Sequence, residues 1–232
     1  VDSSIGGKTG INTKHGKNLI GSFYQPRLVI SDLNFLNSLK KRELICGYGE
    51  ILKHSLISKN NFFNFLNKNA SNIIGLRTIY IQKAIYESCV IKKKVVEKDE
   101  KEKNVRKILN LGHTFGHAYE ASLNYSKKLN HGEAVLLGIN TAIKFSFIKK
   151  LLHIKEYNFI TNHFKKFKLP YEIKNYFSPS QYKIIASFMT KDKKNKSDKI
   201  NLILLKKIGH PIINKNYKKK VIENFIKKEL SN

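Results

Sequence analysis

The stretch from Lys40 to Ile57, KKRELICGYGEILKHSLI, decides the fold. Its apolar residues recur four and seven positions apart and therefore share one face of a helix: Leu44, Ile45, Ile51, Leu52, Leu56 and Ile57. Residues 73–97 continue this pattern, and helical patterns dominate to about Met189. Because a helix with one apolar face must bury that face against other elements, the sequence predicts a mainly α protein.

The remaining segments carry other signals. Residues 1–21 are rich in Gly, Ser, Lys and Asn without an apolar period, which predicts an extended loop. Residues 27–31 predict a short edge strand of an α/β sheet, and residues 200–205 predict another strand. Ser178-Pro179 is typical of a helix start, and residues 217–230 predict a basic amphipathic helix. We therefore expect one mostly helical domain that carries a remnant of an α/β layer.

The chain is strongly basic: its 232 residues hold 44 Lys and Arg against 17 Asp and Glu, a net charge of +27. Many lysines lie in monotonous runs such as KDKKNK at residues 191–196, which we interpret as a solvated surface rather than a shaped binding groove. No helix-turn-helix, zinc-finger or RNP signature accompanies them, so we expect no specific nucleic-acid partner.

The sequence also indicates the cellular compartment in which the protein is expected. The most apolar long window, residues 134–148, is interrupted by Asn140 and Lys144 and is shorter than the ~20 residues of a membrane span. Cys46 and Cys89 show no CxxC spacing and are too few for a disulfide framework, which favours a reducing, cytoplasmic location. The chain opens on a Gly-rich loop without an initiator Met, so we expect that further residues precede it.

Histidines and glycines mark a candidate metal site. The segment NLGHTFGH at residues 110–117 is followed by His131-Gly-Glu, and His113 and His117 project from one helical face. Thr follows His113, so this is not the HExxH of zinc proteases. A single histidine on a helix is most often structural, but glycines at 112, 116 and 132 leave room for a ligand or another backbone.

Two further features carry charge. Glu50 and Lys53 lie on one helical face, either as a surface ion pair or as part of a site. The opening SSIGGKTG at residues 3–10 lacks the Walker spacing, which argues against a nucleotide triphosphatase. Backbone N–H groups of such a loop bind anions, and Lys8, Lys17 and Asn18 supply further donors.

Seven segments in series resemble the 3-dehydroquinate synthase family: DSSIGGKTGIN (residues 2–12), GKNLIGSFYQP (16–26), GYGEILK (47–53), DEKE (99–102), LNLGHTFGHA (109–118), HGEAV (131–135) and DKK (192–194). The resemblance covers residues 1 to about 210. It implies that residues 1–38 are the tail of an α/β NAD-binding domain with a substrate loop, and that residues 39–232 are a C-terminal helical domain with the metal and substrate site.

The resemblance also implies an activity: NAD-assisted conversion of DAHP, a phosphorylated keto acid, into 3-dehydroquinate and phosphate, in the shikimate pathway. It implies that Zn²⁺ or Co²⁺ binds to Glu50, His113 and His131. The implied NAD contacts are Lys8, Lys17, Phe35, Leu36, Asn37 and Ser38.

The resemblance implies that the substrate phosphate contacts Lys8, Asn18, Asn110 and His117. It implies that the carboxylate contacts Lys92 and Arg106, and that hydroxyl groups contact Asp2 and Lys53. It also implies a substrate contact late in the chain, at Lys193 or Lys194. The proton acceptor stays open between His117 and the leaving phosphate itself. We also expect a homodimer.

The sequence departs from the family pattern at His54-Ser55, where Tyr-Gly is common, and in a Lys-rich interval at residues 124–130. The Gly-rich dinucleotide segment of the family is not among these residues, so we expect this chain alone to hold NAD weakly. Three other classes stay open: a different sugar phosphate cyclase, such as a deoxy-inosose or valiolone synthase, a metal-dependent polyol dehydrogenase, and, least favoured, a basic nucleic-acid-binding protein.

Overall fold

The structure is a computed structural model, and it describes residues 1–13, 16–59, 61–190 and 198–231. Its helices are α1 (Lys41–Ile57), α2 (Phe62–Ile74), α3 (Thr78–Lys98), α4 (His113–Ser122), α5 (His131–Ile148), α6 (Ile154–Lys166), α7 (Tyr182–Met189) and α8 (Lys219–Ser231). Its strands are β1 (Ile11–Thr13), β2 (Gly16–Ile20), β3 (Lys199–Lys207) and β4 (His210–Lys218), and short 3₁₀ helices span Leu33–Ser38, Val105–Asn110, Ile173–Asn175 and Pro179–Gln181. The predicted mainly α fold is confirmed.

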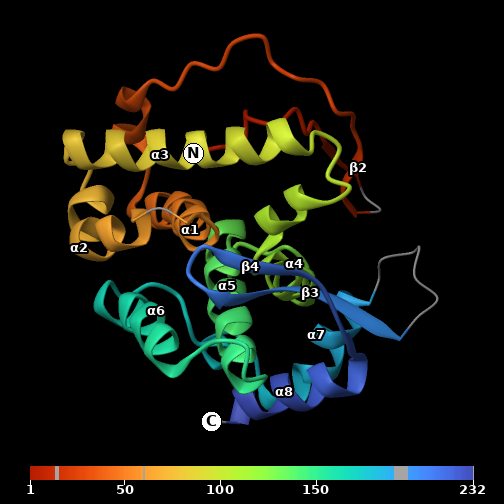
Figure 1. Cartoon of the computed structure of the whole chain (residues 1–232). Coiled ribbons are helices and arrows are strands. Elements are labelled where there is room, and N and C mark those ends of the chain that lie inside the picture. The colour runs from red at the N-terminus through yellow and green to blue at the C-terminus, as the bar shows by residue number, and fades with distance from the viewer. Residues whose placement is uncertain (14–15, 60, 191–197, 232) are drawn as a thin grey trace.

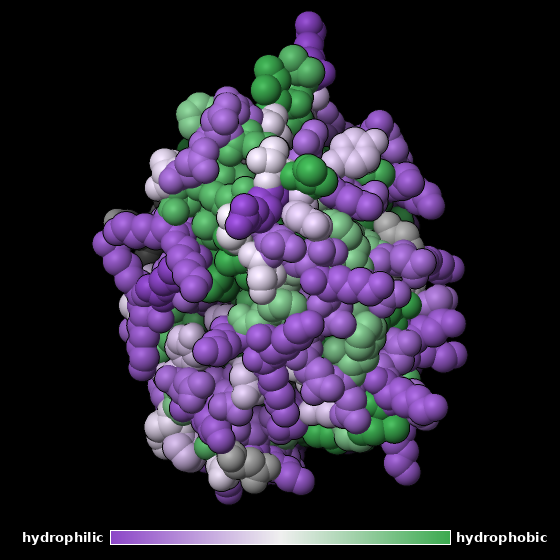
Figure 2. Space-filling view, turned by 90° about the vertical axis from the view of Figure 1, so that its left-hand side faces the viewer, coloured by the Kyte–Doolittle hydropathy of each residue, from purple (hydrophilic) through white to green (hydrophobic). Residues whose placement is uncertain are grey.

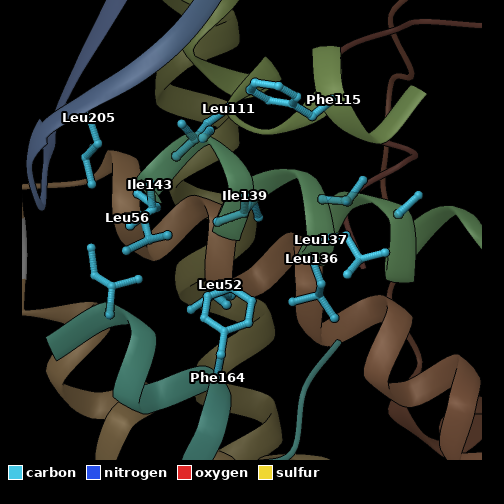
Figure 3. Packing of buried hydrophobic residues seen from close by; sticks show 14 of the residues in the cluster. Leu52, Leu56, Leu111, Phe115, Leu136, Leu137, Ile139, Ile143, Phe164 and Leu205 are labelled. Atoms are coloured by element: carbon cyan, nitrogen blue, oxygen red, sulfur yellow. The ribbon is translucent and has the colours of Figure 1, made fainter. Parts of the chain in front are cut away.

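Helix α5 forms the centre of the molecule. It is buried almost along its whole length, because apolar and small residues lie on every face of it. Figure 1 shows α1, α2 and α3 on one side of α5, α6 beside it, and α7 and α8 near its C-terminal end. In Figure 3, Ile139 and Ile143 of α5 lie near Leu52 and Leu56 of α1, and Phe164 of α6 points toward the same cluster.

The C-terminal part of the chain closes this core with a hairpin. Strands β3 and β4 pair antiparallel, and the buried side chains of β3 pack toward α5. The expected strand at residues 200–205 is confirmed as part of β3. The sequence analysis did not predict β4, and α8 begins at Lys219 rather than at Tyr217 because Tyr217 pairs with Ile200 in the hairpin.

Two predictions about the N-terminal segment are wrong. Residues 27–31 form no strand: Leu28 and Ile30 are 75% and 81% exposed, and no described strand pairs with them. An extended segment becomes a strand only when a neighbour satisfies its backbone N–H and C=O groups. Residues 1–21 are not simply a loop, since β1 and β2 pair antiparallel there. In Figure 1 the chain after β2 arches past α3 to reach α1.

The boundaries of the other elements follow local signals. The helix expected at 73–97 begins at Thr78, because the chain turns at Gly75 and Leu76 takes a positive φ of 56°. Ser178 caps the short helix Pro179–Gln181, with Pro at its first turn as expected. Among the described residues, none of the helices combines the length and apolar character that crossing a membrane requires.

The basic side chains lie mainly on the surface. On the face shown in Figure 2, hydrophilic side chains are dispersed among apolar ones. This agrees with the interpretation of most lysines as solvated surface, although the run at 191–196 lies outside the described residues.

Candidate metal and substrate site

Close contact between three helices builds the site. A β-carbon added at Gly132, in the first turn of α5, would lie 2.4 Å from the Cα atom of Cys46 on α1. One added at Gly138 would lie 2.1 Å from the carbonyl oxygen of Gly112, just before α4. The expected room beside the histidines is therefore filled by backbone, which brings α1, α4 and α5 together.

The first turn of α5 is fixed by Glu133 of the His-Gly-Glu segment. Its carboxylate accepts hydrogen bonds from the backbone N–H of Asn130 at 2.8 Å and from the Nε and Nη2 atoms of Arg42 at 2.7 and 2.6 Å. A capping carboxylate that also pairs with an arginine of α1 holds the start of α5 on α1. This contact fixes the position of the backbone of His131, which lies two residues before Glu133.

Three histidines meet at the ends of α4 and α5. Each of His113, His117 and His131 has a ring nitrogen within 4.8 Å of those of the other two. The ring centroids of His113 lie 5.4 Å from His117 and 5.9 Å from His131. His113 is partly buried, whereas His117 and His131 are exposed. The predicted placement of His113 and His117 on one helical face is confirmed.

Glu50 lies beside this cluster. Its Oε1 atom is 3.7 Å from the Nε2 atom of His113, and its Oε2 atom pairs with Lys53. The side chains of Glu50 and Lys53 are 17% and 4% exposed, so the surface ion pair is excluded. Burial alone would raise the pKa of Glu50, but the charge and hydrogen bond of Lys53, together with His54, lower this pKa overall, so the carboxylate is ionised at neutral pH.

The donor set suits a divalent metal. Burial and then Lys53 hold the pKa of His113 well below its usual value, which keeps the ring neutral. The Nδ1 atom of His113 lies 3.4 Å from the carbonyl oxygen of Leu111, which leaves Nε2 as the ligand atom. Nitrogen and oxygen ligands of tetrahedral zinc lie roughly 3.3–3.5 Å apart. The 3.7 Å between His113 and Glu50 is close to that separation.

Asp2 forms the centre of a second polar cluster. Its Oδ2 atom is 2.9 Å from the Nζ atom of Lys92, which also donates to the Asp2 carbonyl oxygen at 2.6 Å. Burial tends to raise the pKa of Asp2, but His54, Lys53 and Lys92 outweigh it and lower this pKa far below its usual range. The carboxylate is thus fixed as an anion beside the ammonium groups of Lys92 and Lys53.

His54, at one of the departures from the family pattern, belongs to this second cluster. Its Nδ1 atom lies 2.5 Å from the Oγ atom of Ser88, and its Nε2 atom lies 3.6 Å from Oδ2 of Asp2. Burial, followed by the positive charge of Lys53, lowers the pKa of His54 to about 3. A neutral imidazole with its Nε2–H toward Asp2 fits these contacts, with the Ser88 hydroxyl donating to Nδ1.

Arg106 is held entirely inside the protein. It is 1% exposed, and its guanidinium donates to the carbonyl oxygens of Glu100 and, at 2.7 Å, of Gly6. Its Nε atom has no hydrogen-bond partner. The backbone N–H of Arg106 donates to Asp99 at 3.0 Å, as do those of two neighbours. Arg106 therefore joins the N-terminal segment to the loop after α3.

Residues expected to contact a phosphate lie near this loop. Glu102 pairs with Lys8 through one carboxylate oxygen and accepts from the Nδ2 atom of Asn110 through the other. The structure thus brings Lys8 and Asn110 to one carboxylate. His117 lies instead in the histidine cluster, at the exposed end of it.

Comparison with known proteins identifies the family of this chain. Residues 47–195 match the family described as 3-dehydroquinate synthase C-terminal, and residues 1–46 match 3-dehydroquinate synthase N-terminal. The chain belongs to the 3-dehydroquinate synthase family. It is 62% identical over 231 residues to the 3-dehydroquinate synthase of Pelagibacter ubique and 42% identical over 204 residues to that of Alkaliphilus metalliredigens. These matches cover 100% and 88% of this chain but 63% and 56% of the relatives.

Solved structures show the same fold. A 2-epi-5-epi-valiolone synthase from Streptomyces hygroscopicus, with NAD⁺ and Zn²⁺ bound, has a TM-score of 0.84 at 21% identity. The match covers 100% of this chain and 63% of that one. A 2-deoxy-scyllo-inosose synthase complexed with carbaglucose-6-phosphate, NAD⁺ and Co²⁺ has a TM-score of 0.79 at 26% identity, over 98% of this chain and 62% of that one.

Several family positions predicted as contacts stay untested by the structure. Lys193 and Lys194 lie outside the described residues, and Lys17 and Asn18 lie on β2 with side chains that are not described. Residues 35–38 belong to the 3₁₀ helix Leu33–Ser38, where Phe35 is 74% exposed.

The sequence analysis missed one residue that contacts a family motif. Glu120 is 3% exposed, and its Oε2 atom lies 2.8 Å from the Nδ1 atom of His131. Its position three residues after His117 and seven after His113 places it on the same face of α4, which is the signal that would have found it.

Proposed function

We propose that this chain provides the metal- and substrate-binding part of a 3-dehydroquinate synthase, a metal- and NAD-dependent lyase that converts DAHP into 3-dehydroquinate and phosphate. The observation that carries the proposal is the meeting of Glu50 and His113 at 3.7 Å beside His131, within a chain of this family. The chain spans about 63% of the length of its Pelagibacter ubique relative, so the complete activity is assigned to a longer polypeptide or assembly.

The metal would be held by Glu50, His113 and His131. A divalent ion there polarises a substrate oxygen, and NAD, when bound, accepts and returns a hydride. Zn²⁺ and Co²⁺ both suit imidazole and carboxylate ligands. Both solved relatives carry one of these ions together with NAD⁺, which supports the same cofactors here.

The protein side chains bind and orient the substrate. Asp2 and Lys53, which lie beside the metal ligands, hold hydroxyl groups through a fixed carboxylate and ammonium. Lys92 and Arg106 are proposed for the carboxylate; the guanidinium of Arg106 is buried against the carbonyl oxygens of Glu100 and Gly6, so it would reach a substrate only by exchanging those contacts. These two positive charges favour a substrate that carries a carboxylate in addition to its phosphate.

The phosphate would lie near Lys8, Asn18, Asn110 and His117. His117 is exposed within the histidine cluster, so it can approach a leaving phosphate and position it. The family contacts at Lys17, Phe35, Leu36, Asn37 and Ser38 are proposed for NAD, and Lys193 or Lys194 for the substrate. We also propose a cytoplasmic homodimer.

The test is a paired phosphate-release assay with DAHP, saturating NAD and Zn²⁺. One sample is residues 1–232, and the other is the same chain joined behind the N-terminal part of the Pelagibacter ubique enzyme. We expect release only from the longer protein, with no release when glucose 6-phosphate replaces DAHP. Turnover of glucose 6-phosphate instead would identify an inosose-type cyclase, and equal rates from both proteins would show that residues 1–232 suffice.

A further inference from the structure

We propose that Glu120 is a positioning residue that orients His131 as a metal ligand; this inference rests on the proposed metal site. The Oε2 atom of Glu120 lies 2.8 Å from the Nδ1 atom of His131. The side chain of Glu120 is 4% exposed, whereas that of His131 is 48% exposed. A buried, fixed carboxylate thus holds a ring that is otherwise half in solvent.

This contact selects one ring nitrogen for the metal. The carboxylate accepts a hydrogen bond, so Nδ1 of His131 carries the proton and donates it to Glu120. Nε2 then keeps its lone pair and is the only ring nitrogen that a metal can bind. A carboxylate partner also makes the imidazole a stronger ligand, and removal of such partners typically lowers metal affinity 10- to 100-fold.

The Nδ1 atom of His113 is also held by a hydrogen-bond acceptor, although the partner is different. Its Nδ1 atom faces the carbonyl oxygen of Leu111 at 3.4 Å, and its Nε2 atom faces Glu50. Both histidines of the proposed ligand set therefore have Nδ1 engaged, which leaves Nε2 as the nitrogen available to a metal. His131 needs the stronger anchor, because it is the first residue of α5 and the more exposed of the two.

Packing between α4 and α5 keeps Glu120 in place. Glu120 and His117 lie three residues apart on α4, so they share a face. A β-carbon at Gly116 would lie 2.9 Å from the carbonyl oxygen of Ala134, which shows how tightly α4 lies on the first turns of α5. The reach from Glu120 to His131 is thus set by helix contact rather than by a flexible loop.

The experiment measures Zn²⁺ and Co²⁺ affinity of the full chain by competition with a chromogenic chelator. We expect about 10-fold weaker binding in Glu120→Gln, which keeps a neutral acceptor, and about 100-fold weaker binding in Glu120→Leu, which removes it. The visible absorption of bound Co²⁺ should change in both variants. Glu229→Gln is the matched control, since Glu229 is 12% exposed and pairs with Lys144 of α5 at 2.6 Å; its metal affinity should equal that of the wild type.

The possible results separate the two proposals. A wild-type chain that binds no metal contradicts the proposed metal site. A wild type that binds metal, with Glu120 variants of equal affinity and unchanged Co²⁺ spectrum, overturns the positioning role. If both variants fail to fold, ¹⁵N NMR of the metal-free wild type at pH 8.5 decides: protonation of His131 at Nδ1 supports the role, and protonation at Nε2 overturns it.

Discussion

The backbone of Cys46 lies so close to Gly132 that a β-carbon at Gly132 would be 2.4 Å from the Cys46 Cα atom. Helices α1 and α5 touch there through backbone alone. Glu50 lies one turn further along α1 and His131 is the neighbour of Gly132, so this contact sets the distance between the two ends of the proposed ligand set.

Gly132→Ala should therefore disturb both stability and metal binding. The added methyl meets backbone that cannot rotate away, and overpacking of this kind costs about 1–3 kcal/mol. Urea denaturation and Zn²⁺ titration measure the two effects. Gly47→Ala is the control on α1: its β-carbon would meet only Val1 at 3.4 Å, so stability should be unchanged or slightly increased. Equal stability and equal Zn²⁺ affinity of the two variants would contradict the close contact between α1 and α5 at Gly132.

Removal of the proposed ligands should abolish metal binding. We expect the chain with Glu50→Ala, His113→Ala and His131→Ala to contain no stoichiometric zinc in elemental analysis, because each of the three-donor clusters in the described part of the chain then loses at least one member. His210→Ala, far along the chain on β4, should keep the metal. Stoichiometric zinc in the triple variant would show that other residues bind it.

His163 should make the protein less stable in acid. Burial lowers its pKa to about 3 in the folded chain, against about 6.5 when unfolded. Between these values the unfolded chain binds a proton that the folded chain does not. The free energy of unfolding therefore falls as pH falls below about 6.5, by up to about 1.4 kcal/mol per pH unit.

Urea denaturation at pH 7 and pH 5 in the presence of a chelator measures this loss. His163→Gln can still accept from Tyr48, whose hydroxyl lies 2.8 Å from Nε2 of His163. It does not titrate, so its stability should change less between the two pH values. Parallel losses in the variant and the wild type would mean that His163 binds a proton equally in the folded and the unfolded chain, so that burial does not lower its pKa.

Lys92 should matter to the substrate and the neighbouring Lys93 should not. Lys92 is 13% exposed and pairs with Asp2, whereas Lys93 is 68% exposed. In the complete enzyme, Lys92→Ala should lower kcat/KM about 10- to 100-fold, the value of one charged hydrogen bond. Lys93→Ala should leave it unchanged. Arg106→Ala is a poorer test, because Arg106 is fully buried and its loss also disturbs packing.

The excess charge should produce only weak DNA binding. We expect nonspecific association that disappears steeply as salt rises, as counterion release dictates. Fluorescence anisotropy of labelled duplexes between 50 and 200 mM salt measures it. Sequence-selective binding at physiological salt would contradict the interpretation of the lysines as solvated surface.

The helical part of the fold could be predicted because its signal is local. The apolar period of residues 40–57 and the Pro after Ser178 specify helices by themselves, and α1 and the 3₁₀ helix Pro179–Gln181 lie where they predict. Strands carry no such self-sufficient signal. Leu28 and Ile30 have the composition of a strand without a described partner, whereas β4 has a weak pattern and forms because β3 lies beside it.

The candidate site could be predicted only in part. His113 and His117 are one helical turn apart, so sequence alone places them together. The meeting of Glu50 with His113, and of Asp2 with His54 and Lys92, depends on how α1, α3, α4 and the N-terminal segment pack together. Glu120 was not predicted, because acidic residues are common in helices and only the structure shows that this one is buried and contacts His131.

The lysines near the site already hold protein carboxylates: Lys8 pairs with Glu102, Lys53 with Glu50 and Lys92 with Asp2. An anionic substrate would therefore enter by exchange, taking each ammonium from an internal counter-ion. The binding free energy of the substrate then depends on the difference between two ion pairs, lysine with substrate and lysine with protein carboxylate. This difference is smaller than the interaction energy of either pair. An arrangement of this kind discriminates between anions by geometry, since only a ligand that replaces several internal partners at once gains free energy.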